Sequence, residues 1–198
     1  TVRCADLGLV NVTLYGTDSN GNTDSCAATV NVIDTVPPVA ICQDISVYLG
    51  LNGSVSVTAG MINNGSLDNC NSITAIKING LDSVVYSCTD AGLRSALLQV
   101  YDSNGNVGSC NANITVIDTV RPIPRCRAVT LPLDASGNLT VNASVIDSNS
   151  FDACGISSLQ FSIGLTTRTY NCSNVGINNV RLIVVDVNGN KDSCSTTI

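Results

Sequence analysis

The side chains with the clearest chemical potential in this sequence are its fifteen carboxylates, all of which belong to aspartate. Asp34 and Asp118 lie in two similar segments, IDTVPP and IDTVRP, which have the composition of linkers that end in proline. A calcium ion, which takes oxygen ligands, could stiffen such a linker if Asp90 or a loop aspartate, Asp68 or Asp152, joined the linker aspartate. The alternative is a solvated linker that its prolines alone restrain. No other cofactor is expected.

Asp18, Asp102 and Asp186 each begin a D-x-N-G-N segment that superficially resembles a calcium loop. An EF-hand loop also needs a glutamate at its twelfth position, and this sequence contains no glutamate. Aspartate commonly caps a tight turn through its own side chain, and Asn-Gly between alternating apolar runs is a strong hairpin signal. We therefore predict that these three segments are hairpin turns.

The ten cysteines fall on one 84-residue period. The positions that share this spacing are Cys4/Cys88/Cys172, Cys26/Cys110/Cys194, Cys42/Cys126 and Cys70/Cys154. Because the chain has no histidine and no C-x-x-C pair, the cysteines fit a disulfide framework better than metal sites. Such a framework predicts an extracellular or cell-surface protein. The lack of histidine also excludes Ser-His-Asp and Cys-His catalysis, and we predict no enzymatic activity.

The same period organises the chain into a partial repeat at 1–38, a complete repeat at 39–122 and a repeat without its exit linker at 123–198. We expect the chain to be an excerpt from a longer tandem tract. In the complete repeat, alternating apolar runs between turn signals predict strands within 39–49, 55–59, 73–78, 83–87, 96–100 and 112–116. Six or seven short strands in a unit of this size are typical of an immunoglobulin-like sandwich. The predicted fold is all-β, with tandem immunoglobulin-like β-sandwich repeats of 84 residues and two disulfides per repeat.

Charge and hydropathy exclude two classes of partner. A net charge of −6 argues against nucleic-acid binding through phosphate neutralisation. No apolar run approaches the roughly 20 residues that a membrane-spanning helix needs. The expected partners are the neighbouring repeats of the same chain.

Four cysteines per repeat allow three pairings. In an immunoglobulin-like sandwich the first and last strands run parallel and adjacent, and Cys42 and Cys110 lie near the same ends of those strands. We therefore favour a nested scheme, with the remaining pair assigned by elimination and with the partners of Cys4 and Cys26 upstream. The scheme predicts the pairs Cys42–Cys110, Cys70–Cys88, Cys126–Cys194 and Cys154–Cys172. An open alternative pairs Cys42 with Cys70, Cys88 with Cys110 and Cys4 with Cys26.

The segments PVAICQDISVYL, CTDAG and DSNGNVGSC, together with the four-cysteine spacing, carry a family resemblance. Over its whole length the chain resembles hyalin-type (HYR-like) repeats, and it is more similar to repeats of very large gliding-motility adhesins of Bacteroidetes-type bacteria. Animal hyalin repeats usually carry a tryptophan and a Cys-Pro near the first strand. Here tryptophan is absent and Cys42 and Cys126 precede Gln43 and Arg127, which favours the bacterial branch. The resemblance implies an immunoglobulin-like fold, export and a role as surface filament or adhesin.

The bacterial resemblance also implies O-glycosylation at Asp-Ser/Thr-apolar triplets. Three triplets match, and their acceptor residues are Thr35, Ser83 and Thr119. Thr35 and Thr119 occupy equivalent linker positions, so we favour a glycan over calcium at the linkers.

The function that these observations predict is a structural stalk or filament segment of a large secreted cell-surface adhesin, with gliding motility as the system that the resemblance implies. One alternative is a module that binds glycan or protein through its loops, such as 63–69 and 148–153, with surface glycans or other filament subunits as partners. Another is an extracellular-matrix repeat of the hyalin type.

Overall fold

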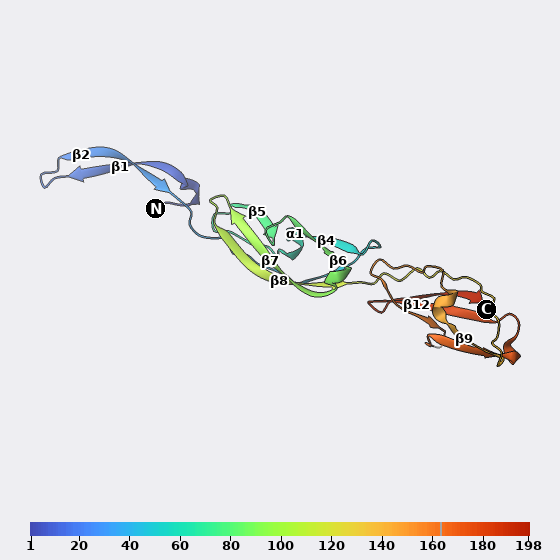
Figure 1. The fold of residues 1–198 in the computed structure, drawn as a ribbon. Helices are drawn as coiled ribbons and strands as arrows, with labels where there is room; N and C mark the ends of the chain where they lie inside the picture. Colours follow the sequence, from blue (N-terminus) through green and yellow to red (C-terminus); the bar gives the residue numbers. More distant parts are fainter. Residues whose placement is uncertain (163) are drawn as a thin grey trace. The chain divides into compact units, whose positions relative to one another are not determined.

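The computed structural model describes residues 1–162 and 164–198, and its regular structure is almost entirely β-strand (Figure 1). The strands are β1 (Gly8–Thr17), β2 (Thr23–Val32), β3 (Ile45–Tyr48), β4 (Ser54–Thr58), β5 (Ile73–Ile78), β6 (Ser83–Ser87), β7 (Gly92–Asp102), β8 (Val107–Ile117), β9 (Asn138–Asn142), β10 (Ile156–Phe161), β11 (Thr167–Asn171), β12 (Asn179–Asp186) and β13 (Lys191–Thr197). The helical elements are single turns: η1 (Cys4–Asp6), α1 (Ala59–Ile62), η2 (Cys88–Asp90), η3 (Ala143–Ile146) and η4 (Cys172–Asn174). Of the helices described, none has the length and apolar character to cross a membrane. The predicted all-β, immunoglobulin-like repeat fold is confirmed.

The first pair of strands, β1 and β2, forms an antiparallel hairpin whose paired residues run from Gly8 and Val32 to Thr17 and Thr23. Gly21 turns the chain between them with a φ of 83°, a conformation that glycine adopts without steric cost. The corresponding strands β7 and β8 are neighbours in the middle repeat, and β12 pairs with β13 in the third. All three D-x-N-G-N segments therefore connect neighbouring strands, as predicted.

The middle repeat contains a four-stranded sheet with the order β3-β8-β7-β5 and a two-stranded sheet of β4 and β6. Alternate residues of its long strands are buried, as the period of two in a half-buried strand requires. The buried apolar residues of β7 and β8 are Ala96, Leu98, Val100, Ala112, Ile114 and Val116. The first predicted strand is shorter than expected, because β3 begins only at Ile45.

The third repeat contains a three-stranded sheet, β10-β12-β13, and a two-stranded sheet, β9-β11. Its core includes Val141, Ile146, Phe161, Leu182 and Val184, each no more than 2% exposed. The two sheets bury their apolar residues in this one cluster, as in a β-sandwich.

The chain forms two compact units. The first consists of Thr1–Ile45, Thr58–Val84 and Ser95–Asn113, and the second of Ser46–Val57, Val85–Arg94 and Ile114–Ile198. Each unit therefore contains one of the two linkers together with parts of the repeats on either side of it. The repeat boundaries after residues 38 and 122 follow the 84-residue period and remain a prediction.

Four disulfides are present, and two of them differ from the nested scheme. Cys42–Cys110 and Cys126–Cys194 form as predicted. The predicted pairs Cys70–Cys88 and Cys154–Cys172 are wrong, because Cys4–Cys70 and Cys88–Cys154 form instead. The partner of Cys4 therefore lies downstream of it, and Cys26 and Cys172 are free and exposed. The second and third repeats each have one internal disulfide, and one further disulfide joins each pair of successive repeats.

The disulfides cross the linkers because a helical turn that precedes each linker lies beside a loop that follows it. Cys4 and Cys88 each begin a short helical turn that precedes a long strand, whereas Cys70 and Cys154 each lie in a loop of the following repeat. The Cα atoms are 5.3 Å apart in Cys4–Cys70 and 5.1 Å apart in Cys88–Cys154, within the range that a disulfide requires. The nested scheme assumed that both cysteines of every pair lie within one repeat. That assumption is wrong for Cys4–Cys70 and Cys88–Cys154.

Candidate functional site: the joints between repeats

Each joint consists of a linker, a loop and a hairpin. The first joint comprises linker 33–38, loop 63–72 and hairpin 102–107, and the second comprises linker 117–122, loop 147–156 and hairpin 186–191. Every position in the second joint lies 84 residues after its counterpart in the first.

The linker aspartates hold the chain in a turn. Oδ1 of Asp34 accepts a hydrogen bond from the backbone N–H of Val36 at 3.0 Å, and Oδ1 of Asp118 accepts one from Val120 at 2.9 Å. This bond from an aspartate to the backbone two residues on is an Asx turn. Pro38 follows in the first linker and is buried, and a Cβ atom on Gly108 would overlap its carbonyl oxygen. The first linker is therefore packed against β8.

The loop aspartates orient the cysteines that join the repeats. Oδ2 of Asp68 accepts hydrogen bonds from the backbone N–H of Cys70 at 2.9 Å and from the hydroxyl of Ser72 at 3.0 Å. In the second joint, Oδ1 of Asp152 accepts the backbone N–H of Cys154 at 2.7 Å. Each loop aspartate thus lies beside an inter-repeat disulfide.

The hairpin aspartates cap their turns, as the sequence predicts. Oδ1 of Asp102 accepts the backbone N–H groups of Asn104 at 2.9 Å and Asn106 at 2.8 Å. Oδ2 of Asp102 accepts the side-chain amide of Asn106 at 2.7 Å, and the same amide nitrogen donates to the backbone carbonyl of Asp34 at 3.1 Å. The last asparagine of the D-x-N-G-N motif therefore connects the hairpin to the linker.

The second joint contains the same connection between hairpin and linker. In the described part of the chain, the hairpin that begins at Asp18 has only the bond within the turn. The Asn190 amide donates to Oδ2 of Asp186 at 2.8 Å and to the carbonyl oxygen of Asp118 at 3.2 Å. In the first hairpin the Asn22 amide donates to Oδ2 of Asp18 at 2.9 Å. Sequence reasoning missed the linker contact, although the recurrence of this asparagine in all three copies was a signal for it.

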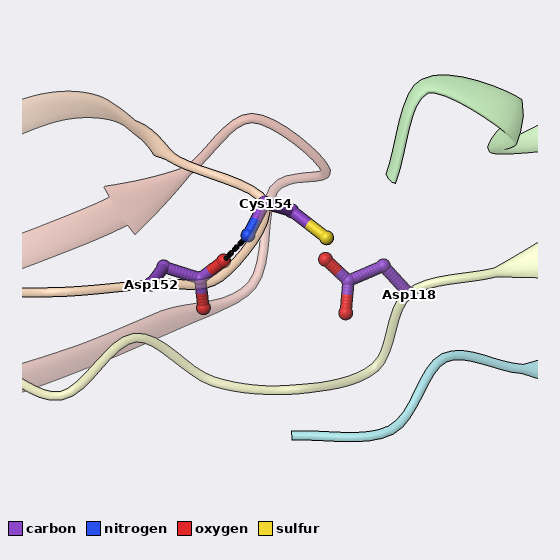
Figure 2. A group of neighbouring side chains, drawn as sticks. All are labelled: Asp118, Asp152 and Cys154. Carbon is purple, nitrogen blue, oxygen red and sulfur yellow. Dashed lines mark hydrogen bonds between the residues drawn. The ribbon is translucent and has the colours of Figure 1, made fainter. Parts of the chain in front are cut away.

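The three elements of the first joint bring Asp34, Asp68 and Asp102 together, with one carboxylate oxygen of each within 4.8 Å of the others. All three residues are at least nine-tenths buried, at 9%, 6% and 3% exposed. In the second joint the carboxylates of Asp118 and Asp152 face each other beside Cys154 (Figure 2). The sulfur of Cys154 is bonded to Cys88 and is therefore no thiolate ligand.

Of the five aspartates predicted at the joints, four lie there and Asp90 does not. Oδ2 of Asp90 caps η2 by accepting hydrogen bonds from the backbone N–H and the hydroxyl of Ser87 at 2.8 and 2.9 Å. Its other oxygen lies 3.7 Å from the Arg94 guanidinium. The hairpin residues Asp102 and Asp186 occupy the joints instead, and the prediction that they form turns alone was incomplete.

Among the described residues, no basic side chain forms an ion pair with a joint carboxylate. The two ion pairs found among residues 1–162 and 164–198 are Lys77–Asp82 and Arg94–Asp90. One oxygen in each linker and loop carboxylate is buried without a hydrogen-bond partner in the part of the chain described. These atoms are Oδ2 of Asp34, Oδ1 of Asp68, Oδ2 of Asp118 and Oδ2 of Asp152.

Two pKa shifts reflect this environment. Burial raises the pKa of Asp152, the hydrogen bond from Cys154 opposes the rise, and the charges of Asp118 and Asp186 add to it. Burial also acts to raise the pKa of Asp102, but the hydrogen bonds from Asn106 and its turn neighbours outweigh burial and leave that pKa below its usual value.

Residues predicted to carry glycans lie on the surface. Thr35, Ser83 and Thr119 are all exposed, whereas Asp34 and Asp118 beside them are buried. Glycosylation at these residues remains a prediction. The loops named as alternative binding surfaces contain the buried Asp68 and Asp152, and Leu67 forms a β-bridge with Val39. Each of these loops therefore belongs in part to a joint.

Gly53 lies directly against an inter-repeat disulfide. Its φ is +71°, and a Cβ atom at this position would lie 2.7 Å from Sγ of Cys88 and 3.2 Å from Cβ of Ala153. We expect Gly53→Ala to destabilise the protein by about 2 kcal/mol or more, because a left-handed alanine alone costs about 1–2 kcal/mol. Urea unfolding and alkylation of Cys88 measure the effect. Gly105→Ala is the matched control, since Gly105 has a φ of +87° but open space around it. Equal losses for the two variants would show that the contact with the disulfide is unimportant.

The hydrogen bonds of Asn106 allow a second matched comparison. Asn106→Ala removes the donor that serves both Asp102 and the Asp34 carbonyl, and we expect a loss of about 1–3 kcal/mol because buried acceptors lose their partner. Asn22→Ala removes the equivalent bond to Asp18 in an exposed hairpin, and we expect a change within about 0.5 kcal/mol. Urea denaturation midpoints measure both. A similar change in the two variants would argue that the linker contact contributes nothing.

Comparison with known proteins gives low similarity throughout. No protein-family model matches the chain. An uncharacterised 81.3 kDa protein of Acholeplasma phage L2 is 25% identical over 193 residues, which is 97% of this chain and 26% of that protein. The chain thus spans about a quarter of the length of this curated relative.

Among solved structures, the titin domains I67–I69 align with a TM-score of 0.43 at 13% identity, over 100% of this chain and 75% of theirs. The extracellular domain of protocadherin GammaB4 aligns with a TM-score of 0.42 at 16% identity, over 100% of this chain and 37% of its own. A Ca²⁺-stabilised ice-binding adhesin of an Antarctic bacterium aligns with a TM-score of 0.31 at 15% identity, over 96% and 55%. Similarities this low carry no functional argument, so the proposed function depends on the strands and joints of this chain.

Proposed function

We propose that this chain is a structural segment of an extracellular tandem-repeat adhesin, and that its joints keep successive repeats covalently connected. The observation that carries the proposal is the staggered order of the disulfides. Their spans are Cys4–Cys70, Cys42–Cys110, Cys88–Cys154 and Cys126–Cys194, and each overlaps the next. Every peptide bond between Cys4 and Cys194 therefore lies inside at least one disulfide loop.

A staggered order of this kind suits a chain that bears mechanical load or is exposed to proteases. Disulfides within single repeats would leave each linker as an unprotected connection. Here a second covalent path bypasses both linkers, because Cys4–Cys70 spans the first and Cys88–Cys154 spans the second. Such disulfides form and persist in oxidising compartments, which supports an extracellular location.

The finer parts of the proposal are supported by the sequence motifs. We propose relationship to hyalin-type repeats of bacterial surface adhesins, and a role in gliding motility, on the basis of the PVAICQDISVYL and DSNGNVGSC segments and the cysteine spacing. We also propose O-glycans on Thr35 and Thr119, which are exposed at equivalent linker positions. Added hexose mass on native peptides that contain these threonines would support the glycan, and unmodified peptides would contradict it.

Single-molecule pulling from the two ends tests the mechanical role. The shortest covalent path follows residues 1–4, 42–70, 110–126 and 194–198 and crosses three disulfides. At about 3.3–3.6 Å per residue, the oxidised chain should extend to only about a quarter of the length of the reduced chain. Equal extension of oxidised and reduced protein would contradict the proposal.

A further inference from the structure

We infer that each joint binds one calcium ion, through Asp34, Asp68 and Asp102 in the first joint and through Asp118 and Asp152 in the second. The inference adds a metal site to the joints of the proposed function but does not depend on it, since the disulfides connect the repeats whether or not an ion is bound.

The first reason is uncompensated buried charge. Asp34, Asp68 and Asp102 are 9%, 6% and 3% exposed, and their carboxylate oxygens lie within 4.8 Å of one another. Buried carboxylates normally pair with a cation or bind a metal, because desolvation of an isolated charge is unfavourable. Neither ion pair found in the described residues involves these three. A divalent cation would supply the missing charge.

The second reason is the unsatisfied oxygens, which recur at the same two positions. Oδ2 of Asp34 and Oδ1 of Asp68 are buried without a partner in the first joint, as are Oδ2 of Asp118 and Oδ2 of Asp152 in the second, among the residues described. Buried polar atoms without a partner are rare in native proteins, and a bound ion or an ordered water can satisfy such atoms. In each joint, the linker aspartate and the loop aspartate therefore each have one carboxylate oxygen available to a shared ion.

The hairpin motif by itself accounts for a turn and not for a metal site. Asp18 makes the same three turn-capping hydrogen bonds as Asp102, but it is exposed and lies in neither group of potential ligands found among the described residues. Asp186 makes those bonds in a joint and is 1% exposed.

Calcium fits these ligands better than other common ions. The ligand atoms are all carboxylate oxygens, whereas zinc and copper prefer imidazole and thiolate, and the Cys154 sulfur is committed to a disulfide. One calcium ion at about 2.3–2.6 Å from each ligand can bridge oxygens up to about 5 Å apart, and the three oxygens of the first joint all lie within 4.8 Å of one another. Magnesium retains several waters and strict octahedral geometry, and these residues are almost fully buried.

Titration of the EDTA-treated 198-residue protein with calcium chloride tests the inference. Isothermal calorimetry should give two sites per chain, and about 10 mM calcium should raise Tm by about 5–10 °C per site if it exceeds Kd a hundredfold. The same concentration of magnesium chloride should give a smaller rise. No binding of calcium, or an equal response to magnesium, would overturn the inference.

Isosteric variants assign the sites. Asp68→Asn and Asp152→Asn should each leave one site, and the double variant should leave none. Asp18→Asn, in the hairpin that belongs to no joint with a carboxylate group, should retain both sites. Circular dichroism in EDTA shows whether the variants fold. Two sites in a folded double variant would refute the assignment to these aspartates.

Thermal melts in EDTA separate a ligand role from a merely structural one. Because Asp152 is buried among like charges, Asp152→Asn should melt at the same or a higher temperature than the parent protein without calcium, and at a lower temperature with it. A lower Tm in both conditions would show that the carboxylate serves the fold and not an ion. Failure of calcium binding leaves the pulling experiment in EDTA unaffected, so the two proposals fail independently.

Discussion

A single tryptic cut after Arg125 should leave the oxidised protein at its full mass on a non-reducing gel and divide it into two fragments, 1–125 and 126–198, on reduction. Arg125 is exposed and lies shortly after the second linker. The Cys88–Cys154 disulfide spans this position, whereas Cys42–Cys110 ends before it and Cys126–Cys194 begins after it. One disulfide between successive repeats thus holds the two fragments together.

The matched control is Cys88→Ser/Cys154→Ser, in which the same cut should release both fragments without reductant. The nested pairing has no disulfide across 110–126, so it would give the released fragments in the parent protein as well. Separation of the parent protein after this cut would therefore contradict the staggered order and remove the observation on which the proposed function depends.

Removal of the Cys88–Cys154 disulfide should cost about 4 kcal/mol in the free energy of unfolding. The two cysteines are 66 residues apart, and the loss of loop-closure entropy for loops of about 15 to 100 residues corresponds to about 3–4.7 kcal/mol. The double variant Cys88→Ser/Cys154→Ser compared with the parent protein in urea denaturation provides the measurement.

Cys172→Ser is the control for this comparison, because Cys172 is the counterpart of Cys88 one period later and is free and exposed. Its substitution should change stability by no more than about 0.5 kcal/mol. If the double variant were as stable as Cys172→Ser, the disulfide between repeats would not restrain the unfolded chain as its loop length requires.

The local features of this protein could be predicted from its sequence. The turns that begin at Asp18, Asp102 and Asp186 depend on side chains within four residues of each aspartate. The alternation of apolar residues in β7 and β8 likewise reflects the period of two in a strand that is buried on one face. Repetition at 84 residues revealed the tandem organisation, since equivalent positions carry equivalent residues.

Contacts between distant residues could be predicted only where strand topology implied them. Cys42 and Cys110 belong to the ends of a sandwich whose first and last strands are adjacent, so their pairing followed from the fold class. Cys88–Cys154 depends on how the loop of one repeat approaches the helical turn of the preceding repeat, and no local pattern encodes that approach.

The composition of the joints was decided by the tertiary structure for the same reason. Linker and loop aspartates were recognisable as candidate ligands, but Asp90 and Asp102 could not be distinguished by residue type. Asp90 lies in η2, where its carboxylate accepts a hydrogen bond from Ser87 and pairs with Arg94. Asp102 is brought to Asp34 by Asn106, whose amide reaches the Asp34 carbonyl across 72 residues of sequence. The period, the strands and the turns could be predicted because they depend on near neighbours along the chain. Which loop, linker and hairpin meet depends on packing between repeats, which no local pattern encodes.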